Sequence, residues 1–170
     1  MLQEKIRIWR VFFTMSNFEN KAEEYISSQN IEVFLPTIKT IQIYRGRNIK
    51  SEVPLFKNYF FAKVDERDRL SICQSPAIVN CVNFRGRLAK ISEDEINSLR
   101  IVITEPERIE VETIPFKTGD QVEVISGVFK GIKGTYTERR GASRVVILLE
   151  EIKQAISIEV ESSTLRKIEG

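Results

Sequence analysis

The sequence predicts a protein of the α+β class, with an α/β sandwich over residues 1–104 and a small β-barrel over residues 116–170. In the first span, β-branched and aromatic runs alternate with segments whose apolar residues recur at helical spacing. Beyond residue 115, short β runs are separated by glycines, a pattern typical of small barrels. Residues 105–115 lie between the two and lack periodicity, which predicts a linker.

The first predicted strand covers residues 6–13, a run of β-branched and aromatic residues with apolar side chains on both faces. This pattern indicates a central strand that is packed on both sides. Asn17 is a suitable N-cap for the helix that follows, in which Ala22 and Ile26 lie on one apolar stripe. Asn30 is a suitable left-handed stop for that helix.

The remaining elements of this span complete a β-α-β-β-β-β-α-β-α order. A capping box, Ser92-x-x-Glu95, opens the last helix, and Arg45 begins a predicted turn over residues 45–48. Helices interleaved with strands of antiparallel type favour a ferredoxin-like sandwich. The other predicted strands cover residues 31–35, 38–44, 52–56, 59–64 and 78–84, and a short helix covers 65–74.

The composition excludes several classes of function. The 170 residues include no histidine and two cysteines, so a histidine-based catalytic triad and a four-ligand zinc site are excluded. We therefore expect no enzyme, no metal site and no cofactor. No apolar run reaches the length of a membrane span, and the N-terminus lacks the features of a signal peptide. These features predict a cytoplasmic protein without membrane association.

The sharpest motif lies in residues 119–134, where Gly127, Gly131 and Gly134 punctuate a strand-loop-strand pattern. Glycines permit positive φ and close backbone approach at barrel corners. The segment resembles a KOW motif, found in SH3-like barrels of transcription elongation factors and some ribosomal proteins. We expect Phe129 on an exposed loop, and we predict that Phe129 and Ile132 bind a partner protein.

The N-terminal motifs extend the resemblance over essentially the whole chain. Trp9 stands in the first strand, Phe-Leu-Pro at 34–36 follows the first helix, and residues 54–61 read Pro-Leu-Phe-Lys-Asn-Tyr-Phe-Phe. Together with the KOW motif, this order resembles the NusG family, whose N-terminal (NGN) domain rides on RNA polymerase. Asn58 stands where housekeeping members usually have glycine, and this variant resembles the specialised RfaH and UpxY paralogues, which are operon-specific antiterminators.

The resemblance also implies sites. By this resemblance, the aromatic positions of the motif would bind the clamp helices of the polymerase β′ subunit. The second predicted helix would contact the β gate loop. The matching aromatic residues are Phe56, Tyr59, Phe61 and Phe84, and the gate-loop candidates are Arg69, Leu70 and Ser71. The surplus of large aromatics around two strands independently favours a docking face, although any one of them could belong to the core.

Basic residues gather locally although the net charge is only +2. Six of them and a single acid, Glu52, occur over residues 39–63. Such runs favour contact with non-template DNA or nascent RNA, although a solvated face explains them equally well. The candidates are Lys21, Arg45, Arg47 and Lys50.

The function that these features predict is transcription antitermination: a monomeric factor binds RNA polymerase and suppresses pausing and termination in long operons, such as those for surface polysaccharide. Two alternatives stay open. One is a general NusG factor that couples polymerase to Rho or to the ribosome, with Rho or a ribosomal protein as the KOW partner. The other, of a different class, is a KOW-type RNA-binding ribosomal protein.

Overall fold

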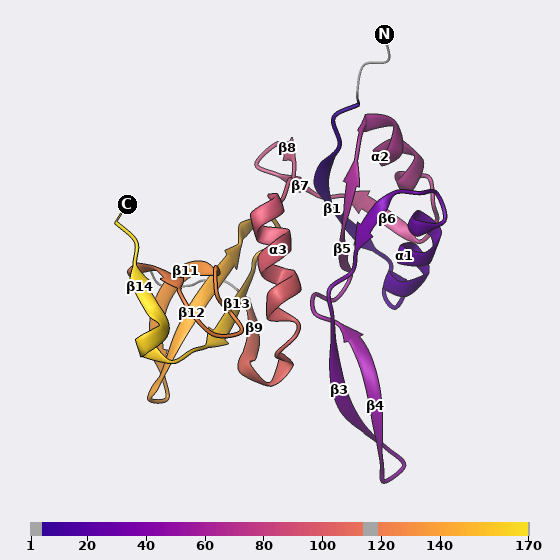
Figure 1. Ribbon diagram of the computed structural model, residues 1–170. Helices are drawn as coiled ribbons and strands as arrows, with labels where there is room; N and C mark the ends of the chain where they lie inside the picture. Colours follow the sequence, from indigo (N-terminus) through magenta and orange to yellow (C-terminus); the bar gives the residue numbers. More distant parts are fainter. Residues whose placement is uncertain (1–4, 114–118, 170) are drawn as a thin grey trace. The chain divides into compact units, whose positions relative to one another are not determined.

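The computed structural model describes residues 5–113 and 119–169, and the chain divides into a first unit, residues 1–96, and a second unit, residues 97–170 (Figure 1). The division falls inside helix α3 (Glu93–Val102). The first unit holds β1 (Ile8–Thr14), α1 (Glu19–Ser27), β2 (Glu32–Phe34), β3 (Thr37–Tyr44), β4 (Arg47–Pro54), β5 (Tyr59–Val64), α2 (Glu66–Cys73), β6 (Ile78–Cys81), β7 (Asn83–Phe84) and β8 (Arg87–Leu88).

The first unit is built on a four-stranded antiparallel sheet in the order β2-β5-β1-β6. The central position of β1 agrees with the prediction, since its apolar residues lie on both faces. Phe12 of β1 stands opposite Phe60 of β5, and their rings stack with centroids 5.2 Å apart. The predicted α+β class is therefore confirmed for this unit.

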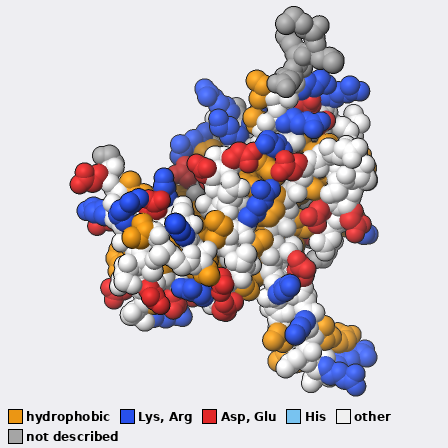
Figure 2. Space-filling view, viewed as in Figure 1, with side chains coloured by type: hydrophobic (Ala, Val, Ile, Leu, Met, Phe, Trp, Pro, Cys, Tyr) orange, Lys and Arg blue, Asp and Glu red, His pale blue; other side chains and the backbone are white. Residues whose placement is uncertain are grey.

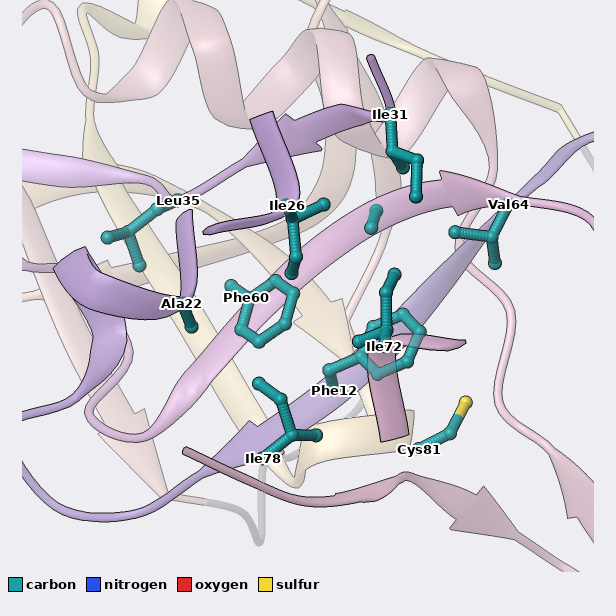
Figure 3. Packing of buried hydrophobic residues seen from close by; sticks show 11 residues of the cluster. Phe12, Ala22, Ile26, Ile31, Leu35, Phe60, Val64, Ile72, Ile78 and Cys81 are labelled. Carbon is teal, nitrogen blue, oxygen red and sulfur yellow. The ribbon is translucent and has the colours of Figure 1, made fainter. Parts of the chain in front are cut away.

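Helices α1 and α2 cover one face of this sheet. Ala22 and Ile26 of α1 and Ile72 of α2 pack around the Phe12–Phe60 pair, and all five side chains are fully buried (Figure 3). By alternation, the neighbours of Phe12 and Phe60 along the two strands point to the opposite face. The sheet thus separates a helix-covered core from a second, aromatic face.

Of the two predicted helix caps, the one at α3 is confirmed, and α2 has a capping box that the sequence pattern did not predict. Asp65 and Asp68 form a reciprocal capping box at α2, and Ser92 accepts from the backbone N–H of Glu95 at α3. The prediction for α1 is wrong: Phe18 is its N-cap residue, with no side-chain cap, and Asn17 instead adopts a left-handed conformation with φ +65°.

Two hairpins extend the first unit beyond the sheet. The long β3–β4 hairpin projects away from it (Figure 1), and the short β7–β8 hairpin follows β6. The β4 strand is longer than the predicted strand 52–56, and the predicted strand 78–84 is interrupted at Val82. Both hairpins close through two-residue turns with positive φ, Arg45-Gly46 and Arg85-Gly86, which is the geometry of type I′ turns.

The second unit is β-rich, and its six strands form one antiparallel sheet. The sheet order is β14-β10-β11-β12-β13-β9, so β14 and β9 are its two ends and no described pairing closes it into the predicted barrel. Its elements are η1 (Pro106–Arg108), β9 (Ile109–Thr113), β10 (Gln121–Val124), β11 (Lys133–Arg139), β12 (Ala142–Leu149), η2 (Glu150–Ile152), β13 (Gln154–Glu159), η3 (Ser162–Thr164) and β14 (Leu165–Lys167).

Part of the predicted linker belongs to this sheet. Ile109–Thr113 forms β9 and pairs with β13 over five residue pairs, while residues 114–118 lie outside the described residues. The expectation of a structureless linker is therefore wrong for β9. Apolar and polar residues do alternate over 109–113, but burial does not follow that alternation, since Val111 is exposed and Glu112 is half-buried. The domain boundaries at 104 and 116 stay predictions.

Glycine positions of the KOW-like motif behave as predicted. Gly127 and Gly131 have positive φ, and Gly134 lies so close to β12 that an added Cβ would stand 2.3 Å from the Val146 carbonyl oxygen. Within residues 5–113 and 119–169, no helix combines the length and apolar character of a membrane span.

Candidate docking surfaces

The four aromatic residues predicted to dock on a partner separate into buried and accessible ones. Phe56 and Phe61 are buried and meet edge-to-face with ring centroids 6.4 Å apart. Tyr59 and Phe84 are half-buried, and the Arg85 guanidinium lies over the Phe84 ring at 4.9 Å. The structure therefore brings Phe56 and Phe61 together as a packed base, and Tyr59 and Phe84 are the less buried members of the set.

Two further aromatic residues, Phe13 and Phe34, belong to the same surroundings. Phe13 stands opposite Tyr59 in the β1–β5 register, and their rings meet edge-to-face at 5.1 Å. Phe34 of β2 stacks on Phe61 at 6.2 Å. Phe13 could have been found from the sequence, because it shares a strand face with Trp9. Phe34 could not, since its position depends on the β2–β5 register.

A hydrogen-bonded turn sets the start of β5 and hence the position of Tyr59. Asn58 has φ +70°, a conformation that favours glycine or asparagine. Its backbone N–H donates to the buried carboxylate of Glu19 (2.9 Å), and its side-chain amide donates to the Thr14 carbonyl oxygen (3.1 Å) and to Ser16 Oγ (3.3 Å). The asparagine therefore ties the β5 turn to the end of β1 and to α1.

The gate-loop candidates lie together on α2 but differ in their contacts. Arg69 is bound in a bidentate pair to the Glu66 carboxylate, which raises the pKa of Arg69 and lowers that of Glu66. Ser71 contacts Gln29, two residues beyond the end of α1, through a 3.4 Å side-chain hydrogen bond. Leu70 is half-exposed, so it is the candidate most available to a partner.

The nucleic-acid candidates occupy two separate places in the first unit. Arg45, Arg47 and Lys50 lie on the β3–β4 hairpin, where every residue from 41 to 50 is exposed. Lys21 lies on α1, with its ammonium group 5.0 Å from the centre of the Phe18 ring. The structure thus gathers three of the four candidates on one projecting element.

The partner-binding candidates of the second unit are buried, which corrects the expected exposure of Phe129. Phe129 is 2% exposed and Ile132 is fully buried. The Arg108 guanidinium covers the Phe129 ring at 5.0 Å. The accessible apolar residue of this loop is Val128, which is 54% exposed and lines an open cavity of about 270 Å³ together with Glu161 and Thr164. A partner at this loop would meet Val128 before Phe129.

The two cysteines do not form a disulfide, and one of them is shielded from solvent. Cys81 is buried and Cys73 is half-buried. Burial, with a smaller contribution from Cys73, raises the pKa of the Cys81 thiol to about 11. Cys81 is therefore a small apolar member of the core rather than a reactive thiol.

Known proteins of similar sequence match most of the length of this chain. The NusG protein of Rickettsia bellii, a transcription termination/antitermination protein, is 22% identical over 171 residues, which cover 94% of this chain and 89% of that protein. Its namesake in Streptococcus pyogenes serotype M3 is 27% identical over 95% of this chain and 96% of that protein. A solved structure described as "Domain interaction in Thermotoga maritima NusG" is 21% identical, covering 96% of this chain and 98% of that one, with a TM-score of 0.47.

The match to a family model decides which protein family the chain belongs to. The model described as "Transcription termination factor nusG" matches residues 7–100, more than half of the chain and nearly all of the first unit. The strand, helix and turn positions that carry the Trp9, Phe-Leu-Pro and Pro-Leu-Phe motifs all lie within this match. The chain therefore belongs to the NusG family.

Proposed function

We propose that this protein is a transcription antitermination factor that docks on RNA polymerase through the aromatic face of the first unit. Membership of the NusG family supports a role in transcription, and the half-exposed Tyr59 is the observation that supports docking. Tyr59 rests on Phe13 and is set in place by the Asn58 turn, so its ring is fixed before a partner arrives. Preorganised aromatic rings on a partly buried base are typical interaction hot spots.

In this proposal, Tyr59 and Phe84 contact the β′ clamp helices and Leu70 contacts the β gate loop. Bridging these two parts of the polymerase would favour the closed clamp over the open one, and such a population shift needs no catalytic residue.

Asn58 supports assignment to the specialised RfaH/UpxY-like branch, which would place the factor in long operons. The second unit would bind a further partner, a ribosomal protein or Rho, at the Val128 loop.

The test measures binding of the full chain to core RNA polymerase. Phe61 is unsuitable as a target, because replacing a buried phenylalanine by alanine typically costs about 3–5 kcal/mol of stability. We expect Tyr59→Ala to weaken binding by about tenfold or more, as interface hot spots do. Tyr25→Ala is the matched control, since Tyr25 is an exposed tyrosine on α1.

A transcription assay gives the functional readout. The wild-type chain should raise readthrough at a terminator, and Tyr59→Ala should abolish that increase while Tyr25→Ala preserves it. Undiminished polymerase binding by a Tyr59→Ala, Phe84→Ala double variant that remains folded would rule out the proposed docking face.

A further inference from the structure

The end of the β3–β4 hairpin has an unusual turn residue. Tyr44 and Arg47 pair across the strands, and Arg45 and Gly46 form the two-residue turn with φ of +50° and +73°. Asparagine or aspartate usually occupies the first position of such a turn, because a longer side chain is strained at positive φ. Turn formation alone therefore does not account for an arginine at this position.

The hairpin also carries uncompensated positive charge. Lys39, Arg45, Arg47 and Lys50 have no carboxylate within ion-pair distance among the described residues. The nearest acid along the hairpin, Glu52, stands at its base and accepts a hydrogen bond from the Thr37 hydroxyl. Figure 2 shows basic and hydrophobic side chains gathered at the free end of the hairpin. Four cations without a carboxylate partner complement a polyanion.

An exposed aromatic side chain and an exposed apolar side chain lie beside these cations in the hairpin. The Tyr44 ring is 59% exposed, and the Arg45 guanidinium lies 5.3 Å from its centre. Ile43, beside Tyr44 in β3, is 77% exposed. An exposed aromatic ring and a guanidinium plane are surfaces on which unpaired bases stack, and adjacent cations neutralise the phosphates of the same strand.

We propose that the tip of the β3–β4 hairpin is a binding site for single-stranded nucleic acid. Bases would stack on Tyr44, while Arg45, Arg47 and Lys50 contact phosphates. A protein partner would use the apolar groups but leave four cations without anions unless its surface were strongly acidic. A duplex would supply phosphates, but its bases are already stacked and unavailable to Tyr44. The combination of ring and charge therefore favours an unpaired strand.

This site is separate from the proposed polymerase-docking face, so the two proposals can fail independently. The probes are fluorescein-labelled single-stranded RNA, single-stranded DNA and duplex DNA, each of about 20 nucleotides or base pairs. Binding of the full chain is followed by fluorescence anisotropy at several salt concentrations, without polymerase. Tighter binding of at least one single strand than of the duplex supports the proposal, and the comparison of RNA with DNA names the ligand.

Two variants separate stacking from charge without disturbing the hairpin. Arg45→Asn removes the cation but suits the left-handed turn, so the hairpin is expected to stay folded. Its matched control is Arg140→Asn, because Arg140 occupies the same kind of turn between β11 and β12 with φ +54°. Tyr44→Thr removes the ring and keeps a strand-forming residue, whereas Tyr44→Phe keeps the ring.

We expect Tyr44→Thr to weaken single-strand binding about tenfold, the effect of losing one base-stacking contact, and Tyr44→Phe to have no effect. Arg45→Asn should lower the slope of log affinity against log salt by about 0.7, the value for one phosphate contact on a single strand. Equal loss in Arg45→Asn and Arg140→Asn would overturn the proposal. So would equal affinity for duplex and single strands, or no measurable binding to either single strand.

Discussion

Gly134 gives the sharpest test of how the KOW-like motif builds the second unit. In the structure, a Cβ at this position would lie 2.3 Å from the Val146 carbonyl oxygen and 2.9 Å from Val145 Cγ1. Ordinary van der Waals contact begins at 3.4 Å. A methyl side chain can yield by rotation, but a backbone oxygen inside a strand cannot, so Gly134→Ala must push β11 away from β12.

The expected loss of stability follows from what this displacement disrupts. Overpacking a well-packed interior costs about 1–3 kcal/mol, and we expect the upper end of that range because the clash is with backbone. The displaced strand also pairs with β10, where Gly134 stands opposite Val122. For a unit of this size, a loss of about 3 kcal/mol lowers the melting temperature by more than about 10 °C.

The assay is thermal and guanidinium unfolding of the full chain, followed by far-ultraviolet circular dichroism. Gly127→Asn is the control, because Gly127 has φ +82° with nothing within 4 Å of an added Cβ, and asparagine tolerates that conformation. We expect the control to lose less than about 1 kcal/mol. If Gly134→Ala is as stable as Gly127→Asn, close strand approach is not the reason for glycine at 134.

Four smaller predictions concern the first unit. Asn58→Ala should cost about 1–2 kcal/mol in chemical unfolding, because it loses two side-chain hydrogen bonds and strains a positive φ, whereas Asn58→Gly should cost less. Ser92→Ala should cost about 1 kcal/mol through loss of the α3 cap, measured in the same way. Cys81 should resist iodoacetamide at about pH 8 until the chain unfolds, since its raised pKa keeps the thiol protonated. The backbone N–H of Asp68 donates to the Asp65 carboxylate and lowers the pKa of Asp65. The ionised Asp65 side chain therefore stabilises the fold above the ordinary carboxyl pKa, and this stabilisation is lost as pH falls through the lowered pKa. As pH decreases, the melting temperature should fall less for Asp65→Asn than for wild type.

Local features of the fold could be predicted because they depend on neighbouring residues. Residues 59–64 form β5 with the predicted bounds, and the Ser92–Glu95 pair caps α3 as its spacing requires. The positive φ at Asn30, Gly127 and Gly131 follows from the same local chemistry. In each case the residue type itself limits the backbone to a few conformations.

Burial of the candidate site residues could not be predicted in the same way. Alternation places Tyr59 and Phe61 on one face of β5, yet Phe61 is buried and Tyr59 is half-exposed. The difference comes from Phe34 and Phe56, which reach Phe61 from elsewhere in the chain. Phe129 is buried for a comparable reason, since Arg108 covers it from η1. Periodicity identifies the face of a strand but not what covers that face.

Three hairpin turns of the described chain share one feature that links sequence, conformation and binding. Arg45, Arg85 and Arg140 each adopt a left-handed conformation immediately before a glycine that has positive φ. The turns at 45 and 85 also place the guanidinium over a preceding aromatic ring, Tyr44 at 5.3 Å and Phe84 at 4.9 Å. Asparagine would form these turns with less strain, so turn geometry alone does not account for the arginines. Glu138 and Arg139, rather than an aromatic residue, precede Arg140, so the turn at 140 carries positive charge but no aromatic ring on which a base could stack. Comparing the turns at 45 and 140 therefore isolates what the Tyr44 ring contributes to binding.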